Sequence, residues 1–235
     1  MSTILITGAS RGLGLEFSRQ YADAGWRVIA TCRHPQTATG LAELRNNVSV
    51  RELDITDASE VMALATDLKW VAIDVLLNNA GIRGPQDETA TFGQLDIETW
   101  LKVMHVNAMA PLKVTEAFLD HVRNSERRTI VFISSRAGSI SERGRLSHHE
   151  HGGPYIYRAS KAALNAGARS LAYDLLPQGI GVLVLHPGWV RTEMGGPEAT
   201  IDVQTSVAGM RSVIDQFTLA QSGTFQSYEG QIIPW

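Results

Sequence analysis

The sequence predicts an α/β protein built on a doubly wound parallel sheet with helices on both faces. Short runs rich in Val, Ile and Leu recur at 3–6, 28–31, 48–53, 73–77, 129–133 and 180–185. Near-continuous apolar runs of this length are typical of parallel strands buried on both faces. Longer segments that include helical patterns separate them, which favours right-handed strand-to-strand crossovers.

The remaining elements follow from glycines and prolines. The first helix is expected to begin near Gly12 and to end near Gly25, since glycine suits the left-handed conformation at a helix exit. A long helix is expected from about Tyr155 to Leu176, where Pro177 stops it. No linker, repeat or low-complexity tract interrupts the pattern, so we expect residues 1–235 to form one domain.

The composition is that of an ordinary globular protein, with 44% hydrophobic and 19% charged residues among 235. The net charge of −3 provides no overall attraction to nucleic acid or to an anionic membrane. No apolar run approaches the roughly 18 to 20 residues that span a bilayer, and no signal peptide is apparent. The single cysteine, Cys32, fits a reducing compartment and is expected to pack rather than react. We therefore expect a cytoplasmic protein without nucleic-acid or membrane partners.

A glycine-rich turn follows the first predicted strand. Residues 7–14 read TGASRGLG and lead into the first predicted helix. Glycines there allow a backbone to approach a pyrophosphate closely, and the amides at a helix start favour its charge. We predict dinucleotide binding by Gly8, Ser10, Arg11, Gly12, Leu13 and Gly14. A tight strand-to-helix crossing would also explain the glycines.

This TGxxxGxG turn and the motifs that follow it in order resemble the short-chain dehydrogenase/reductase family over nearly the whole chain. The other motifs are Leu53-Asp54, Asn78-Asn79-Ala80-Gly81, Asn107, Ile133-Ser134-Ser135, Tyr157-Arg158-Ala159-Ser160-Lys161 and Pro187-Gly188-Trp189-Val190-Arg191-Thr192. The C-terminal stretch, with Gly223-Thr224-Phe225 and residues 230–235, resembles the C-factor and sniffer-like carbonyl reductase branch. The resemblance implies a Rossmann-like fold and hydride transfer between a nicotinamide and a carbonyl or alcohol carbon.

Tyr157 and Lys161 stand four positions apart, which places both on one face of a helix. An ammonium near a phenol favours the phenolate, so we expect Lys161 to lower the pKa of Tyr157. The resemblance implies that Tyr157 is the general acid/base, that Ser135 binds the substrate oxygen and that Lys161 also holds the nicotinamide ribose. It further implies that Asn107 holds a water that connects Lys161 to solvent. Taken singly, Ser135 could instead cap a turn, and Asn107 could simply bend a helix.

The resemblance also implies cofactor contacts at the ends of later strands. Asp54 and Ile55 would meet the adenine, although a turn or N-cap aspartate is an equal alternative. Asn79, Ala80 and Gly81 would pass beside the adenosine ribose, in a sequence that also suits a plain turn. Contacts with the nicotinamide and phosphates would come from Pro187, Gly188, Val190 and Thr192.

The end of the second strand indicates NADP(H). An NAD-specific site places an acidic residue there, about 20 residues beyond the glycines. This chain instead has Arg33 there, with no Asp or Glu between Arg33 and Glu43. Arg11 lies within the glycine-rich turn. Two guanidiniums could hold a 2′-phosphate through their planar forks of donors, the alternative being ordinary solvated arginines.

Two loops that follow strands, 136–153 and 193–200, are predicted walls of the substrate site. Ser135 and Tyr157 are further apart than is usual in the family, which implies an insertion within 140–153 that acts as a flap. The His148-His149-Glu150-His151 cluster lacks metal-site spacing and reads as solvated loop, so no metal is expected. His105 and His186 are expected to be structural, and Trp189 to be either core or active-site wall.

The small residues Ala159, Ala162, Ala163, Ala166, Gly167 and Ala168 would let another helix approach closely. We expect a homodimer or homotetramer that buries this helix and the one near 108–123; packing within one subunit is the alternative. The leading functional hypothesis is an NADP(H)-dependent oxidoreductase acting on a small-molecule carbonyl or secondary alcohol. The second is a signalling protein of C-factor type that binds the dinucleotide with little turnover.

Overall fold

The computed structural model describes residues 1–44, 47–85, 87, 91–142 and 154–235. These residues contain a seven-stranded parallel sheet in the order β3-β2-β1-β4-β5-β6-β7. Its strands are β1 (Thr3–Ile6), β2 (Arg27–Cys32), β3 (Val48–Glu52), β4 (Val75–Asn78), β5 (Thr129–Ile133), β6 (Gly181–His186) and β7 (Thr224–Ser227). The predicted doubly wound α/β fold is confirmed, and its strand order reverses between β1 and β4.

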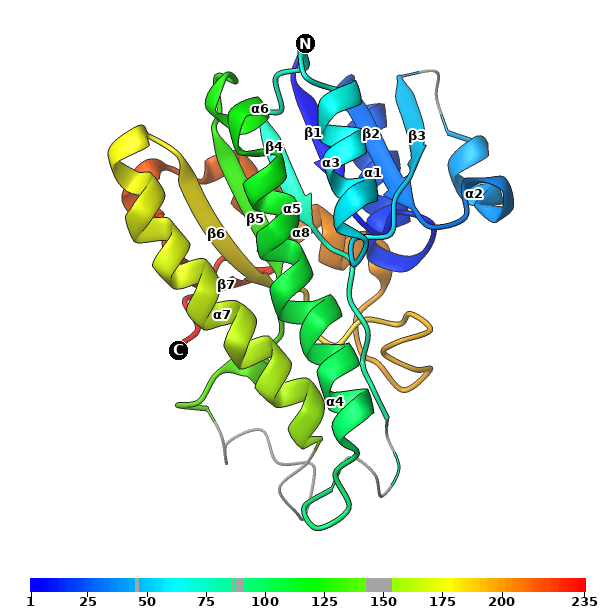
Figure 1. Cartoon of the computed structure of the whole chain (residues 1–235), viewed down its shortest axis with the longest axis vertical. Coiled ribbons are helices and arrows are strands. Elements are labelled where there is room, and N and C mark those ends of the chain that lie inside the picture. The colour runs from blue at the N-terminus through cyan, green and yellow to red at the C-terminus, as the bar shows by residue number, and fades with distance from the viewer. Residues whose placement is uncertain (45–46, 86, 88–90, 143–153) are drawn as a thin grey trace.

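Helices cover both faces of the sheet because neighbouring strand residues point to opposite sides. One core layer contains Leu5 and Leu76, packed by α3 (Ala58–Asp67), α5 (Ala110–Ala117) and α7 (Tyr155–Leu175). The other contains Ile4 and Ile6, packed by α1 (Gly12–Asp23), α2 (Thr39–Ala42) and α8 (Val203–Gln216). In Figure 1, α3, α5 and α7 lie in front of the sheet.

Shorter elements complete the chain. They are α4 (Ile97–Met104), the π-helical turn η3 (His105–Met109), α6 (Leu119–Arg123) and the 3₁₀ turns η1 (Pro35–Thr37), η4 (Arg136–Gly138), η5 (Leu176–Gln178) and η6 (Leu219–Gln221). Helix α7 ends one residue before the predicted position, and Pro177 lies inside the 3₁₀ turn that follows it.

The sheet has one strand more than the six apolar runs predict. β7 reads Thr-Phe-Gln-Ser, so it lacks the Val, Ile and Leu that mark the others. Its position is nevertheless buried: Gln226 and Ser227 are each 3% exposed. Pairing with β6, from Leu183–Thr224 to His186–Ser227, supplies the backbone partners that make this strand stable.

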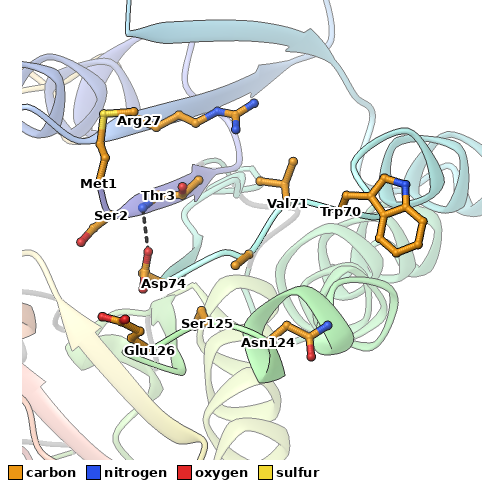
Figure 2. A pocket seen from close by; sticks show the side chains of 11 residues that line it. Met1, Ser2, Thr3, Arg27, Trp70, Val71, Asp74, Asn124, Ser125 and Glu126 are labelled. Carbon is orange, nitrogen blue, oxygen red and sulfur yellow. Dashed lines mark hydrogen bonds between the residues drawn. The ribbon is translucent and has the colours of Figure 1, made fainter.

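All carboxyl ends of the strands lie at one edge of the sheet, and the amino ends at the other. At the amino edge is a shallow pocket lined by Thr3, Arg27, Trp70, Asp74 and Glu126, among others, shown in Figure 2. There the Thr3 backbone N–H donates to Asp74 Oδ2 at 2.8 Å, so the carboxylate fixes the start of β1. None of the predicted site residues lines this pocket.

Candidate active site at the carboxyl ends of the strands

The glycine-rich turn is built so that β1 can pass directly into α1 beside the end of β4. Gly8 has a φ of +67°, and a side chain there would come within 2.8 Å of Ala80 Cα. At Gly14 a side chain would meet the Gly8 carbonyl oxygen at 2.3 Å. Asn79 Nδ2 donates to the carbonyl oxygens of Thr7 and Gly8, at 2.9 and 3.1 Å. The predicted tight crossing is therefore present, and Asn79 stabilises it.

The start of α1 has the features of an anion site. No side chain caps this helix, and its first turn contains no acidic residue. Helices α3, α4 and α8 are capped by the carboxylates of Asp57, Asp96 and Asp202, whereas α5 and α7 lack a side-chain cap as α1 does, so the glycine-rich turn is what distinguishes the start of α1. Because the amides at a helix start favour negative charge, the uncapped end of α1 fits a pyrophosphate. Ser10 and Arg11 are exposed there, whereas Leu13 packs against the core.

The ends of β2 and β3 bring Arg33 and Asp54 together. Arg33 is exposed directly after β2. Burial acts to raise the pKa of Asp54, but hydrogen bonds from Thr56 and the charge of Arg33 outweigh it and lower the pKa. The Asp54 carboxylate accepts from Thr56 N at 2.9 Å and from Thr56 Oγ1 at 2.7 Å. Asp54 thus stabilises a turn, which leaves its predicted contact with the adenine untested, and Ile55 beside it is buried.

The segment after β6 lies over the glycine-rich turn. Gly188 has a φ of +86°, and the Pro187 carbonyl oxygen accepts from Ser206 Oγ at 2.7 Å. Val190 forms a bridge with Ile201. A side chain on Gly12 would come within 3.5 Å of Thr192 Cγ2, so Thr192 stands next to the start of α1. The exposed Arg11 guanidinium forms an ion pair with Glu193 at 3.1 Å.

Ser135 and Tyr157 lie together at the end of β5 and the start of α7. Ser135 caps η4 by accepting from Ala137 N at 3.1 Å, and it also forms a side-chain hydrogen bond with Tyr157. Burial raises the pKa of Tyr157, against the opposing effects of Ser135 and of the Arg83 charge. The expected lowering of this pKa by Lys161 is therefore wrong, because desolvation dominates. A raised pKa keeps the phenol protonated at neutral pH.

Lys161 lies one turn further along α7 and is 5% exposed. Its ammonium is 6.0 Å from the centre of the Tyr157 ring and donates to the Ile133 carbonyl oxygen at 3.0 Å. Burial lowers the pKa of Lys161 to about 8. The sequence prediction that Tyr157 and Lys161 share one face of a helix is confirmed, although the ammonium contacts the strand end rather than the phenol.

Asn107 is fully buried in the π-helical turn between α4 and α5. Its amide exchanges two hydrogen bonds of 2.8 Å with the Ile82 backbone, and Nδ2 also donates to Ser160 Oγ at 3.0 Å. A side chain on Gly81 would lie 3.2 Å from Asn107 Oδ1 and 3.6 Å from Lys161 Nζ. Asn107 and Lys161 therefore face the same small space, which glycine leaves free.

Arg83 is a site residue that the sequence analysis missed. It follows the Asn79-Ala80-Gly81 turn by two positions, and its NH1 donates to the Met194 carbonyl oxygen at 2.9 Å. This bond joins the loop after β4 to the loop after β6. A basic residue just beyond a strand-end turn is the signal that could have indicated it.

The structure also places the cysteine, the tryptophan and the histidine that the sequence singles out near the site. Cys32 is 4% exposed, and burial raises the pKa of its thiol, so its packing role is confirmed. Trp189 is 49% exposed and donates Nε1–H to the Gly195 carbonyl oxygen, so it is not a core residue. Burial and the charge of Arg136 lower the pKa of His186 to about 3. The histidine cluster and nearly all of the predicted flap lie outside the described residues.

The model of the short chain dehydrogenase family matches residues 2–201, most of the chain. The protein belongs to that family. Its curated relatives include the C-signal of Myxococcus xanthus, 42% identical over 173 residues, which cover 74% of this chain and 99% of that protein. The predicted family and its C-factor-like relatives are thus confirmed.

Solved structures of carbonyl reductases have the same fold as this chain. The carbonyl reductase Sniffer of D. melanogaster is 33% identical with a TM-score of 0.91, and the match covers 100% of both chains. The NADPH-bound carbonyl reductase from chicken fatty liver is 32% identical with a TM-score of 0.90, covering 100% of this chain and 99% of that one. The fold and family place this chain among oxidoreductases. Within the described ranges, no helix is long and apolar enough to cross a membrane.

Proposed function

We propose that this protein is an NADP(H)-dependent carbonyl reductase that acts on a small aldehyde or ketone, or, in reverse, on the corresponding primary or secondary alcohol. The observation that carries the proposal is the convergence of Ser135, Tyr157, Lys161 and Asn107 at one edge of the sheet. These residues lie at the end of β5, on α7 and in the π-helical turn. Both the relatives and the uncapped start of α1 support a dinucleotide beside them.

In this proposal Tyr157 gives a proton to the substrate oxygen, and Ser135 donates a hydrogen bond to the same oxygen. Positioned donors of this kind stabilise the charge that develops on the oxygen. Because burial raises the pKa of Tyr157, the phenol is protonated at neutral pH and has a proton to give. Lys161 and Asn107 restore the proton through the small space beside Gly81. The bound NADPH supplies the hydride.

The cofactor contacts follow the strand ends. Gly8, Ser10, Gly12, Leu13 and Gly14 hold the pyrophosphate at the start of α1. Asp54, Ile55, Asn79, Ala80 and Gly81 border the adenosine half, while Pro187, Gly188, Val190 and Thr192 border the nicotinamide half. Arg33 and Arg11 hold the 2′-phosphate. To do so, Arg11 gives up its exposed ion pair with Glu193.

We further propose a cytoplasmic homodimer or homotetramer of one-domain subunits. Ala162 is partly exposed and Ala166 is exposed on α7, so both are available to a second helix, whereas Ala163 packs against the core of its own subunit. Gly167 instead packs within its own subunit, because a side chain there would meet Leu112 at 2.7 Å. Sedimentation at micromolar concentration tests this, and a monomer contradicts it.

A second candidate function is signalling through dinucleotide binding with little turnover, favoured by the 42% identity to the C-signal of Myxococcus xanthus. The complete set of Ser135, Tyr157, Lys161 and Asn107 favours the enzyme. The deciding experiment compares NADPH consumption across a panel of aldehydes and ketones with NADPH binding measured by calorimetry. Turnover that depends on the carbonyl supports the reductase, whereas tight binding without turnover favours signalling.

A further inference from the structure

The backbone around Arg83 is fixed against the helices that carry Tyr157. Asn107 holds Ile82 through two hydrogen bonds of 2.8 Å. Gly84 lies against α4 and α7, since a side chain there would come within 3.1 Å of Val103 Cγ2 and 3.8 Å of Ile156 Cγ2. Because both neighbours of Arg83 are held in place, the backbone from which its side chain extends is rigid.

From this base the Arg83 side chain crosses to the loop after β6. Its NH1 donates to the Met194 carbonyl oxygen at 2.9 Å, 111 positions along the chain. The guanidinium is also close enough to Tyr157 for its charge to lower the pKa of that phenol, against the larger effect of burial. The charge therefore stands between the proposed proton donor and the loop that we predict to be a substrate wall.

The charge of Arg83 differs from that of Arg136, which also lies beside the site. Arg136 directly follows Ser135, and its guanidinium lies 3.1 Å from the Glu142 carboxylate. Within the described ranges of the chain, no carboxylate is paired with Arg83, and only its NH1 is seen to donate a hydrogen bond. An arginine presents five N–H donors in a planar fork that matches a carboxylate.

The loop that binds Arg83 through a backbone carbonyl also carries exposed apolar side chains. Met194, whose backbone binds Arg83, is 42% exposed, and Trp189 is 49% exposed. The Trp189 ring is held by its hydrogen bond to the Gly195 carbonyl oxygen at 2.9 Å. The same loop thus offers apolar side chains near a cation that has no carboxylate partner among the described residues, which suits a ligand with an apolar body and one anionic group.

We propose that Arg83 binds the carboxylate of the substrate, so that the preferred substrate is an aldehyde or ketone that also bears a carboxylate. The carbonyl lies at Tyr157 and Ser135, the carboxylate at the Arg83 fork, and the apolar part along Met194. This proposal rests on the proposed carbonyl reduction and specifies its substrate class.

The test compares a keto acid with its methyl ester, which has nearly the same shape without the charge. Steady-state kcat/KM is measured with saturating NADPH for the wild type, Arg83→Met and Arg83→Lys. Arg123→Met, on α6, is the matched control, since Arg123 is an exposed arginine whose side chain, among the described residues, bonds to Asp120 and Gln178. A hydrogen bond to a charged group predicts a preference of at least about tenfold for the acid in the wild type.

Arg83→Met is expected to lower kcat/KM for the acid by about ten- to a hundredfold, mainly through KM, and to change the ester much less. Arg83→Lys is expected to recover part of the loss, because it keeps the charge without the planar fork. Equal use of acid and ester by the wild type overturns the proposal. An equal loss on both substrates in Arg83→Met also overturns it, because Arg83 then only holds the loop at Met194.

A binding measurement separates this proposal from the reductase activity itself. If no variant reduces either compound, the proposed carbonyl reduction fails, and calorimetry of the keto acid with NADP⁺-loaded protein decides the Arg83 question alone. Weaker binding of the acid by Arg83→Met than by the wild type supports the carboxylate site. Equal or undetectable binding by both contradicts it.

Discussion

Replacing the buried Lys161 with methionine is expected to stabilise the protein while abolishing its activity. The 5% exposed ammonium has a pKa near 8, against an ordinary value of 10.5, because burial penalises the charge. The difference of about 2.5 pKa units corresponds to roughly 3 kcal/mol of destabilisation at pH 7. Methionine fills similar space without a charge.

Part of this gain is lost, since the Ile133 carbonyl oxygen no longer receives its hydrogen bond from Nζ. That loss is about 1 kcal/mol, which leaves a net gain of about 2 kcal/mol. For a chain of this size, such a gain raises Tm by roughly 4 to 8 °C. Turnover and NADPH affinity are both expected to fall, because the proposed mechanism assigns the ammonium to the proton path and to the nicotinamide ribose.

The pH dependence distinguishes this cause from ordinary packing. Below about pH 8 the lysine is charged in both the folded and unfolded states, so the penalty is complete. Between the folded pKa of about 8 and the unfolded value of 10.5, the folded protein holds a neutral amine and the penalty fades. The Tm difference should therefore shrink as pH rises through this window.

The assay is thermal unfolding of the nucleotide-free wild type and Lys161→Met at about pH 7 and about pH 9.5. Lys102→Met, an exposed lysine on α4, serves as the control and should leave Tm nearly unchanged. A variant less stable than the wild type at pH 7 would refute the reasoning. So would a stability difference that does not shrink at the higher pH.

Three further predictions follow from the site and its support. Arg33→Asp should weaken or reverse the preference for NADPH over NADH by repelling the 2′-phosphate; equal kcat/KM for both cofactors in the wild type would contradict that reading of Arg33. Because burial raises the pKa of Tyr157, alcohol oxidation, which needs the phenolate, should still be rising at pH 9, whereas carbonyl reduction should decline only at still higher pH. A pH-independent oxidation rate above pH 7 would argue against Tyr157 as the base. Gly8→Ala should lower the stability by at least about 2 kcal/mol, which is more than the loss expected for Gly25→Ala. Both glycines have a positive φ, but of the two only Gly8 has a backbone atom within 3 Å of the added side chain. Equal Tm losses in the two variants would show that the contact with Ala80 is not the cause.

Much of the fold could be predicted because the parallel sheet is buried on both faces. Apolar runs mark β1 to β6, and glycine and proline mark the ends of α1 and α7. β7 escaped detection since pairing with β6, rather than side-chain hydrophobicity, makes it a strand. Local sequence carries no signal for an edge strand of Thr-Phe-Gln-Ser whose polar residues are covered by the C-terminal segment.

The closeness of the candidate residues Tyr157 and Lys161 could be predicted from the sequence, but their electrostatics could not. The spacing of Tyr157 and Lys161 gives their common helix face, yet it does not reveal that Nζ binds the Ile133 carbonyl oxygen. The raised pKa of Tyr157 depends on burial by several elements that are distant in sequence. Likewise, Arg83 gains its position through Met194, which no local pattern connects with it.

The most direct test of the account is Tyr157→Phe, assayed for NADPH-dependent reduction of the best aldehyde or ketone from the panel. The substitution removes only the hydroxyl that gives the proton. If Tyr157 is the general acid, kcat falls by at least about a hundredfold, while the Kd for NADPH stays within a few-fold of the wild-type value. A variant that binds NADPH normally and keeps most of its activity would contradict the assignment of Tyr157 as the general acid.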